Sequence, residues 1–201
     1  MGEKLLFQPL TREDKITVVL YRAGIVISTA IIAGLSYLLM TVSENSDIAF
    51  INLSGDILAY ALHVSIGVSV FFIHLYIGKI KRYLKNLFFI SLGCLAVLLY
   101  LGQGSVAGAL VHTPYSPLLL LPISGCLGFV TAKEAFCFKL FEGYLLAMIM
   151  PLYLLLVANH SLTGRGVSYG LGLIAVILVI FTLRKVFMPM AYDIGDKSAY
   201  Q

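Results

Sequence analysis

The chain has 201 residues, of which 60% are hydrophobic and 12% charged, with a formal net charge of +4. Soluble domains are roughly 45–50% apolar and about 25% charged, so the composition excludes an ordinary soluble domain. Apolar runs near the ~20 residues that cross a bilayer recur along the chain. We therefore predict one all-α transmembrane domain over residues 1–201, whose first run is retained because no signal-peptide cleavage pattern precedes it.

Six membrane spans are predicted in chain order. The pattern Thr11-x-x-Asp14 indicates a helix start just before the first span, and Pro117 suits the first turn of the fourth. A cationic loop (79–85) and an uncharged loop (102–117) separate spans, and Asp193 to Lys197 is predicted to be a solvated tail. The predicted spans cover residues about 16–40, 57–78, 87–101, 117–141, 144–158 and 169–187.

The orientation is predicted from the cations, because lysine and arginine near span ends favour the cytoplasm. With the N-terminus inside, every lysine and arginine except Arg165 falls on the cytoplasmic side. With five or seven spans, the lysines and arginines would be divided between the two sides of the membrane. We therefore predict six transmembrane helices with both termini cytoplasmic.

Several ionisable residues are predicted at a similar depth in the cytoplasmic leaflet. Lys133 follows Pro117 by about 24 Å of helix, which places it with Glu134 inside a hydrocarbon core ~30 Å thick. Arg22 lies about 9 Å into the first span, and His74 about 6 Å from the end of the second. The sequence thus predicts a polar layer in which Glu134 can pair with Arg22.

Two interpretations of this layer stay open. Arg22 and Lys133 can extend to lipid phosphates while Glu134 forms an architectural ion pair. Alternatively, the layer lines a cytoplasm-facing cavity for an anion, a lipid headgroup or a small solute, with Arg22 and Lys133 as its cationic ligands. Cys137 lies one turn after Lys133 and so shares its face, where an ammonium can activate a thiol.

The cysteines and histidines indicate no metal site or cofactor. None of the cysteines forms a Cys-x-x-Cys pair, so neither a disulfide framework nor a zinc site is predicted. Each is expected to be a small buried hydrophobe, and they are Cys94, Cys126 and Cys137. His63 and His74 lie near one helix face, as ligands of two haems on one helix can, but the remaining histidines, His112 and His160, both lie near the outer surface, so two haems are not expected. One haem, ligated by His63 and by His112 or His160, stays open as an alternative. No catalytic residues are identified.

Four strings resemble the family of bacterial integral membrane proteins catalogued as domain of unknown function 2301. They are Tyr21-Arg22-Ala23-Gly24, Ile73-His74-Leu75-Tyr76, Lys133-Glu134-Ala135-Phe136-Cys137-Phe138 and Asp193-Ile194-Gly195-Asp196-Lys197-Ser198. The resemblance implies a multi-pass protein of the bacterial inner membrane. It transfers no activity, but it includes the residues that the depth estimate selects: Arg22, His74, Lys133, Glu134 and Cys137.

The leading hypothesis is a non-enzymatic role in ligand or lipid binding, or in membrane-complex assembly, through this layer and Phe136, Phe138 and Phe141. A transporter or channel for a small solute or ion is the first alternative, and a haem-binding membrane protein is the second. Expected partners are the bilayer, a membrane protein and anionic headgroups, but no nucleic acid. The cations expected near those headgroups are Lys79, Lys81, Arg82 and Lys85.

Overall fold

The computed structural model describes residues 10–41, 48–162 and 164–194, with residues 48–52 described by their backbone alone. These ranges contain helices and no strand. The helices are α1 (Arg12–Thr41), α2 (Ile48–Phe72), α3 (Gly78–Leu101), α4 (Val106–His112), the 3-10 helix η1 (Ser116–Leu120), α5 (Leu121–Phe138), α6 (Phe141–Ala158), α7 (Arg165–Val186) and α8 (Ala191–Ile194).

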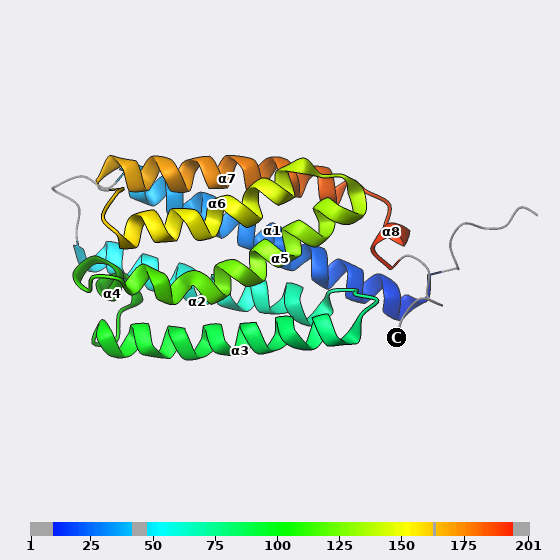
Figure 1. Ribbon diagram of the computed structural model, residues 1–201, viewed down its shortest axis with the longest axis horizontal. Helices are drawn as coiled ribbons and strands as arrows, with labels where there is room; N and C mark the ends of the chain where they lie inside the picture. Colours follow the sequence, from blue (N-terminus) through cyan, green and yellow to red (C-terminus); the bar gives the residue numbers. More distant parts are fainter. Residues whose placement is uncertain (1–9, 42–47, 163, 195–201) are drawn as a thin grey trace, which may run out of the picture.

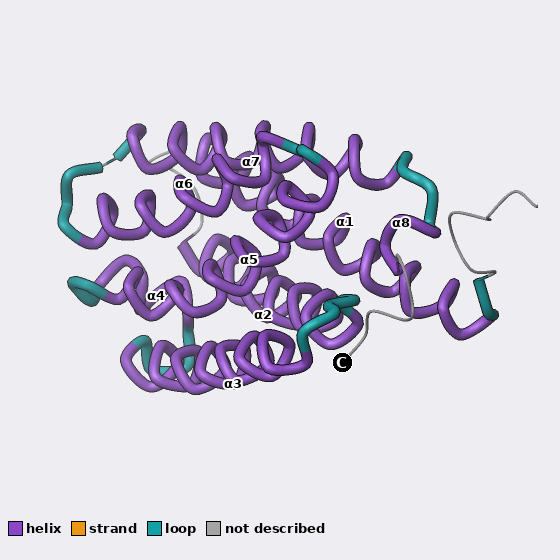
Figure 2. The backbone as a smooth tube through the Cα atoms, turned by 45° about the vertical axis from the view of Figure 1, so that its right-hand side comes forward, coloured by secondary structure: helices purple, strands orange, loops and turns teal. Residues whose placement is uncertain are grey.

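Six helical segments are long and apolar enough to cross a membrane, which confirms the predicted all-α, six-span architecture. They are α1, the Leu53–Phe72 part of α2, α3, η1 together with α5, α6 and α7. The long helices lie side by side in one bundle, with α5 between α3 and α6 (Figures 1 and 2).

The two ends of the bundle differ in charge. We call the end that holds the start of α1, the α2–α3 and α5–α6 connections and α8 the basic end, at the right of Figure 1, and the opposite end the far end. Among the described residues, Arg165 at the start of α7 is the one lysine or arginine at the far end. This distribution agrees with an even number of spans; the cytoplasmic side of the bundle stays a prediction.

The connection between the second and third spans differs from the predicted one. α2 ends at Phe72 rather than Gly78, and α3 begins at Gly78 rather than Leu87. The cationic stretch 79–85 therefore forms the first turns of α3 instead of a loop. Lysine and arginine are good helix formers, whereas the true turn lies in an apolar stretch that has neither proline nor glycine before Gly78.

Residues 102–117, predicted as a loop, contain the short helix α4 and the start of η1. The Ser105 hydroxyl caps α4 by accepting a hydrogen bond from the Gly108 amide at 2.9 Å. Asp56 of α2 accepts from the Ala107 amide at 2.8 Å and from the Ser105 hydroxyl at 3.2 Å. Asp56 thus fastens α4 to the bundle.

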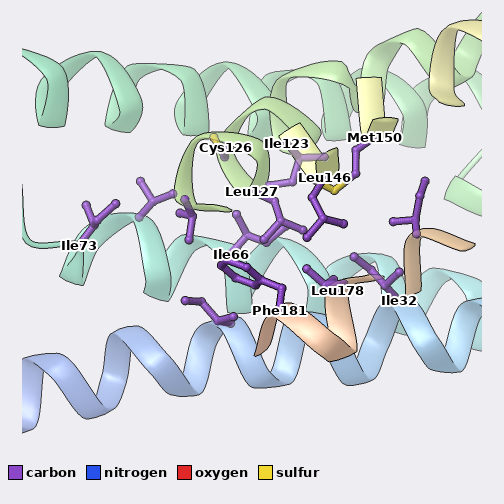
Figure 3. Close-up of a cluster of buried hydrophobic side chains, with 14 of the residues drawn as sticks. Ile32, Ile66, Ile73, Ile123, Cys126, Leu127, Leu146, Met150, Leu178 and Phe181 are labelled. Carbon is purple, nitrogen blue, oxygen red and sulfur yellow. The ribbon is translucent and has the colours of Figure 1, made fainter. Parts of the chain in front are cut away.

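The core lies where α1, α2, α5, α6 and α7 meet, and Figure 3 shows Ile66, Leu127, Leu178 and Phe181 converging there. α1 and α2 approach closely at Gly24, where a Cβ atom would lie 2.3 Å from the Ser69 Oγ. Small residues permit such approaches between membrane helices. The tight helix contacts hold the polar side chains of the basic end in place.

Candidate functional site

Glu134 of α5 is the centre of a buried set of polar contacts at the basic end. It is 0% exposed. Its Oε1 accepts hydrogen bonds from the Tyr21 hydroxyl at 2.6 Å and from the Lys133 Nζ at 2.7 Å. Its Oε2 forms an ion pair with Lys185 of α7. A buried carboxylate requires such partners, because removing a charge from water is costly when it stays unpaired.

Arg22 of α1 binds the segment that follows α7. Its Nε and Nη2 lie 2.7 Å and 2.6 Å from the Asp193 Oδ2. The other guanidinium contacts are to the carbonyl oxygens of Val186 at 3.0 Å, Met188 at 2.7 Å and Pro189 at 3.2 Å. These contacts match the five N–H donors of a guanidinium, so the donors of Arg22 are all used.

Lys185 joins the two groups of contacts. It is 0% exposed, and its Nζ forms ion pairs with both Glu134 and Asp193. The same ammonium lies 4.2 Å from the ring centroid of Phe138, a favourable cation–π position. We call the continuous set Arg22, Asp193, Lys185, Glu134 and Lys133 the charge network. It contains three cations and two carboxylates, so it carries one positive charge in excess.

A cavity of about 230 Å³ adjoins the charge network, and we call it the basic pocket. Lys133 is the network cation in its lining. The Lys133 Nζ contacts the Glu134 carboxylate and lies 5.5 Å from the Tyr21 ring centroid. An ammonium has three N–H donors, so Lys133 retains donors for a further acceptor. The full lining is His74, Leu75, Tyr76, Ile77, Ile80, Lys133, Phe136, Cys137, Tyr192 and Asp193.

His74 supplies a titratable group to the basic pocket from the non-helical segment between α2 and α3. Its Nε2 lies 3.2 Å from the Thr17 Oγ1. The Thr17 hydroxyl donates its proton to carbonyls one turn back in α1, so it accepts from Nε2. The His74 Nδ1 is buried and has no hydrogen-bond partner in the described ranges. Burial lowers the pKa of His74, and the charges of Lys133 and Lys81 lower it further.

The structure brings the predicted polar residues together but changes their pairing. Arg22, His74, Lys133 and Glu134 all lie at the basic end, as the depth estimate predicts. The predicted pair of Glu134 with Arg22 is wrong, because Arg22 binds Asp193 instead. The expected solvation of Asp193 is also wrong, since the chain folds back through α8 and leaves this residue 4% exposed.

Two residues of the charge network, Lys185 and Asp193, were not predicted as site residues, and neither was Tyr21, which donates to Glu134. Lys185 lies in the last turn of α7 beside Arg184, and both match the ordinary pattern of cations at a span end. The rotation of α7 about its own axis determines that Lys185 points into the bundle and Arg184 does not. For Tyr21 and Asp193 the one signal was their place in the strings that carry the family resemblance.

The cysteines differ in environment. Cys126 is buried, as expected, whereas Cys94 is partly exposed. Cys137 is exposed, contrary to the expectation of a buried hydrophobe, and it lines the basic pocket together with Lys133. The predicted shared face of Cys137 and Lys133 is therefore confirmed.

The two histidines considered as haem ligands lie in different places. His63 of α2 is 4% exposed and lines a separate cavity toward the far end. His74 lies beyond the end of α2, so the idea that the two histidines share one helix is wrong. Within the described ranges, no group of three histidine, cysteine or acidic residues could hold a metal ion.

The chain is similar to one protein family and to one protein of known sequence. A family model described as "Uncharacterized integral membrane protein (DUF2301)" matches residues 68–201. The chain is also 26% identical, over 208 residues, to a Haemophilus influenzae protein described as an uncharacterized protein. That alignment covers 100% of this chain and 99% of the relative. No solved structure matches the chain.

Proposed function

Because the chain belongs to the DUF2301 family of integral membrane proteins, whose description assigns no activity, we propose a role from the basic end itself. The protein binds the phosphate group of an anionic lipid in the basic pocket and catalyses no reaction there. The excess positive charge of the buried network is the observation that supports this proposal.

The charge count favours an anion as the missing partner. Within the part of the chain that the structure describes, Arg22, Lys133 and Lys185 form ion pairs with two carboxylates, Glu134 and Asp193. An unpaired buried charge is costly, and a phosphate at the network would balance it. The unpartnered Nδ1 of His74, once protonated, would donate a second hydrogen bond to the same anion.

Lys133 is the residue that we expect to contact the phosphate. The donors of Arg22 are used by Asp193 and by backbone carbonyls. Lys185 is fully buried between its two carboxylates and is not part of the pocket lining. Lys133 lines the pocket and keeps free donors, and hydrogen bonds between charged groups are the strong ones.

The surroundings of the pocket favour a lipid over a free phosphate ion. Phe136 lines the pocket and is 80% exposed, and Ile77 of the same lining is 53% exposed. Apolar side chains beside a cationic group match an amphiphile whose acyl chains continue from a charged head. The cations at the start of α3 would add attraction for anionic lipids.

Nothing among the described residues favours transport over binding. The buried apolar side chains of Leu146, Leu178 and Phe181 (Figure 3) do not line the cavity toward the far end, and Leu178 and Phe181 precede Lys185 in α7, on its far-end side. A transported ion or polar solute would have to cross this packed region. A static binding role requires no such path.

The test compares lipid retention by two lysine variants in phosphatidylcholine nanodiscs that contain phosphatidylglycerol. Lys133→Met removes the positive charge of Lys133 but keeps a side chain of similar length. The charge network then holds two cations and two carboxylates. We expect roughly tenfold weaker phosphatidylglycerol retention in native mass spectrometry, since hydrogen bonds to charged groups contribute about 1.5–3 kcal/mol. Lys139→Met is the matched control, because Lys139 is exposed at the same end.

Two outcomes would contradict the proposal. Equal retention by the Lys133→Met and Lys139→Met proteins would show that the pocket does not select the headgroup. Displacement of the lipid by millimolar glycerol 3-phosphate would show instead that a soluble phosphate is the ligand and that the acyl chains contribute nothing.

A further inference from the structure

A second, larger cavity of about 400 Å³ lies in the half of the bundle toward the far end. It is lined by α1, α2, α4, η1, α5, α6 and α7, and almost all of its lining side chains are apolar. Examples are Leu35, Leu62, Leu110, Leu127 and Leu171. Its volume falls within the ~300–1,000 Å³ of small-molecule sites. It shares no lining residue with the basic pocket.

His63 places one polar group in this apolar wall. The residue is 4% exposed, and its Nδ1 lies 2.9 Å from the Ala59 carbonyl oxygen. A carbonyl only accepts hydrogen bonds, so Nδ1 carries the proton and the Nε2 of the neutral ring is an acceptor. Among the described residues, the only hydrogen bond of the His63 ring is the one at Nδ1, so Nε2 has no partner there. The buried hydroxyl of Ser124, another lining residue, also lacks a partner in the described part of the chain.

The lining suits an apolar occupant better than water. A buried water needs about two to four polar partners, and cavities with apolar walls stay dry or take apolar molecules. His63 and Ser124 supply too few partners to hold water throughout a cavity of this size. A molecule with an apolar body and one hydrogen-bond donor would match both the wall and the free Nε2.

We infer that this cavity binds a lipid-soluble molecule with a hydroxyl group, such as a long-chain phenol or alcohol, whose O–H donates to the Nε2 of His63. The apolar body of the ligand fills the space between the leucine side chains. α4 closes part of the wall with Val106, Ala107, Leu110 and Val111, and Asp56 holds α4 there. This site is independent of phosphate binding at the basic end.

The test uses the full protein in nanodiscs and two photoreactive probes, a diazirine-bearing alkylphenol and its methyl ether. After irradiation, mass spectrometry of the peptides measures labelling of the cavity lining. We expect the phenol to label the lining about fivefold more than the ether, the factor that one neutral hydrogen bond supplies. A diazirine-bearing alkanol run in parallel distinguishes a phenol from an aliphatic alcohol as the better ligand.

Three variants separate recognition by His63 from general partitioning into the membrane. His63→Leu should reduce phenol labelling to the level of the ether and leave ether labelling unchanged. Leu154→Phe, which fills the cavity, should reduce labelling by both probes. Leu152→Phe is the matched control on the same helix, since Leu152 is 53% exposed and does not line the cavity; it should change neither.

Two results would overturn the inference. One is equal labelling by phenol and ether in the original protein, because the hydroxyl would then not be recognised. The other is a Soret band in the purified protein that disappears in His63→Leu, because His63 would then be a haem ligand. If His63→Leu fails to fold, the ratio of phenol to ether labelling and the Leu154→Phe and Leu152→Phe pair still decide the question.

Discussion

The best-buried polar side chains of the two halves of this bundle differ in their partners. At the basic end, Glu134 and Lys185 are fully buried and each has charged partners. Toward the far end, His63 and Ser124 line an apolar cavity, and each has a polar atom without a partner among the described residues. Glu134 and Lys185 thus find their partners within the chain, whereas His63 and Ser124 each leave a polar atom available to a ligand.

This difference shows which half can change shape. Burial of apolar side chains gives little drive for helices to associate in lipid, so packing and polar contacts must hold them. The charge network joins α1, α5, α7 and α8 through directional contacts that fail if one member moves. The cavity walls meet through leucine side chains, which tolerate small shifts. The basic end is therefore the rigid part and the far half the adaptable part.

The largest expected effect tests the rigidity of the basic end. Glu134→Gln keeps the shape of the side chain but leaves three network cations with one carboxylate. Removing one partner from a buried ion pair typically costs about 3–5 kcal/mol. We expect a loss of that size in the free energy of unfolding, measured by denaturant titration in detergent micelles.

Glu142→Gln is the control for this change. Glu142 pairs with Arg184, whose side chain is 50% exposed, so the pair should contribute no more than about 1 kcal/mol. If both variants lose equally little stability, water reaches Glu134 and the contrast between the two halves disappears.

A smaller effect is expected where α4 covers the far cavity. Asp56→Ala removes the acceptor for the Ala107 amide and the Ser105 hydroxyl. Loss of a helix-start acceptor typically costs about 0.5–2 kcal/mol. The amide hydrogens of α4 should therefore exchange with solvent faster, by the factor to which this loss of free energy corresponds, whereas exchange in α5 should stay unchanged. Hydrogen-exchange mass spectrometry measures both rates.

Asp56→Asn separates the hydrogen bond from the charge, because asparagine keeps the accepting Oδ1. Its α4 amides should exchange nearly as slowly as those of the original protein. Rapid exchange in both variants would mean that the carboxylate charge holds α4, and unchanged exchange in both would mean that apolar packing alone does.

The smallest effect concerns pH at the basic pocket. Burial and the charges of Lys133 and Lys81 hold the pKa of His74 below its ordinary value, so the unfolded chain binds this proton more readily than the folded one. Stability should fall as pH drops through about 6.5 toward the lowered pKa, by at most about 1.4 kcal/mol per pH unit. Denaturation midpoints at several pH values measure this slope.

His74→Gln should remove this part of the pH dependence, whereas His160→Asn, a change at an exposed far-end residue, should preserve it. Bound phosphatidylglycerol should oppose the loss, since an anion favours the protonated ring. A destabilisation at low pH that persists unchanged in His74→Gln would assign it to another group.

The six spans were predictable because hydropathy and length constrain a membrane helix so strongly. The depth estimate also selected Arg22, Lys133 and Glu134, since a regular rise per residue converts position into depth. The rotation of α7 about its axis and the return of the chain through α8 were not predictable from position along the sequence. Lys185 and Arg184 look alike in sequence, yet α7 buries the first and exposes the second.

The far cavity left no trace in the sequence at all. Its lining consists of the same leucine, isoleucine and valine residues that fill the packed core around Phe181. Whether such side chains meet or leave a space depends on the separation of whole helices, which local patterns do not encode. His63 was noticed as a candidate ligand, but its apolar surroundings became visible only in the folded bundle.

The position of Asp193 also has a consequence for biogenesis. Asp193 follows all six spans in the chain, so the ribosome adds it only after Arg22, Glu134 and Lys185 have been made. Until then the nascent bundle holds three inward cations against one carboxylate. The arrival of Asp193 supplies the second carboxylate of the charge network, so the ion pairs that join α1 and α7 to α8 can form only after the last span has been made.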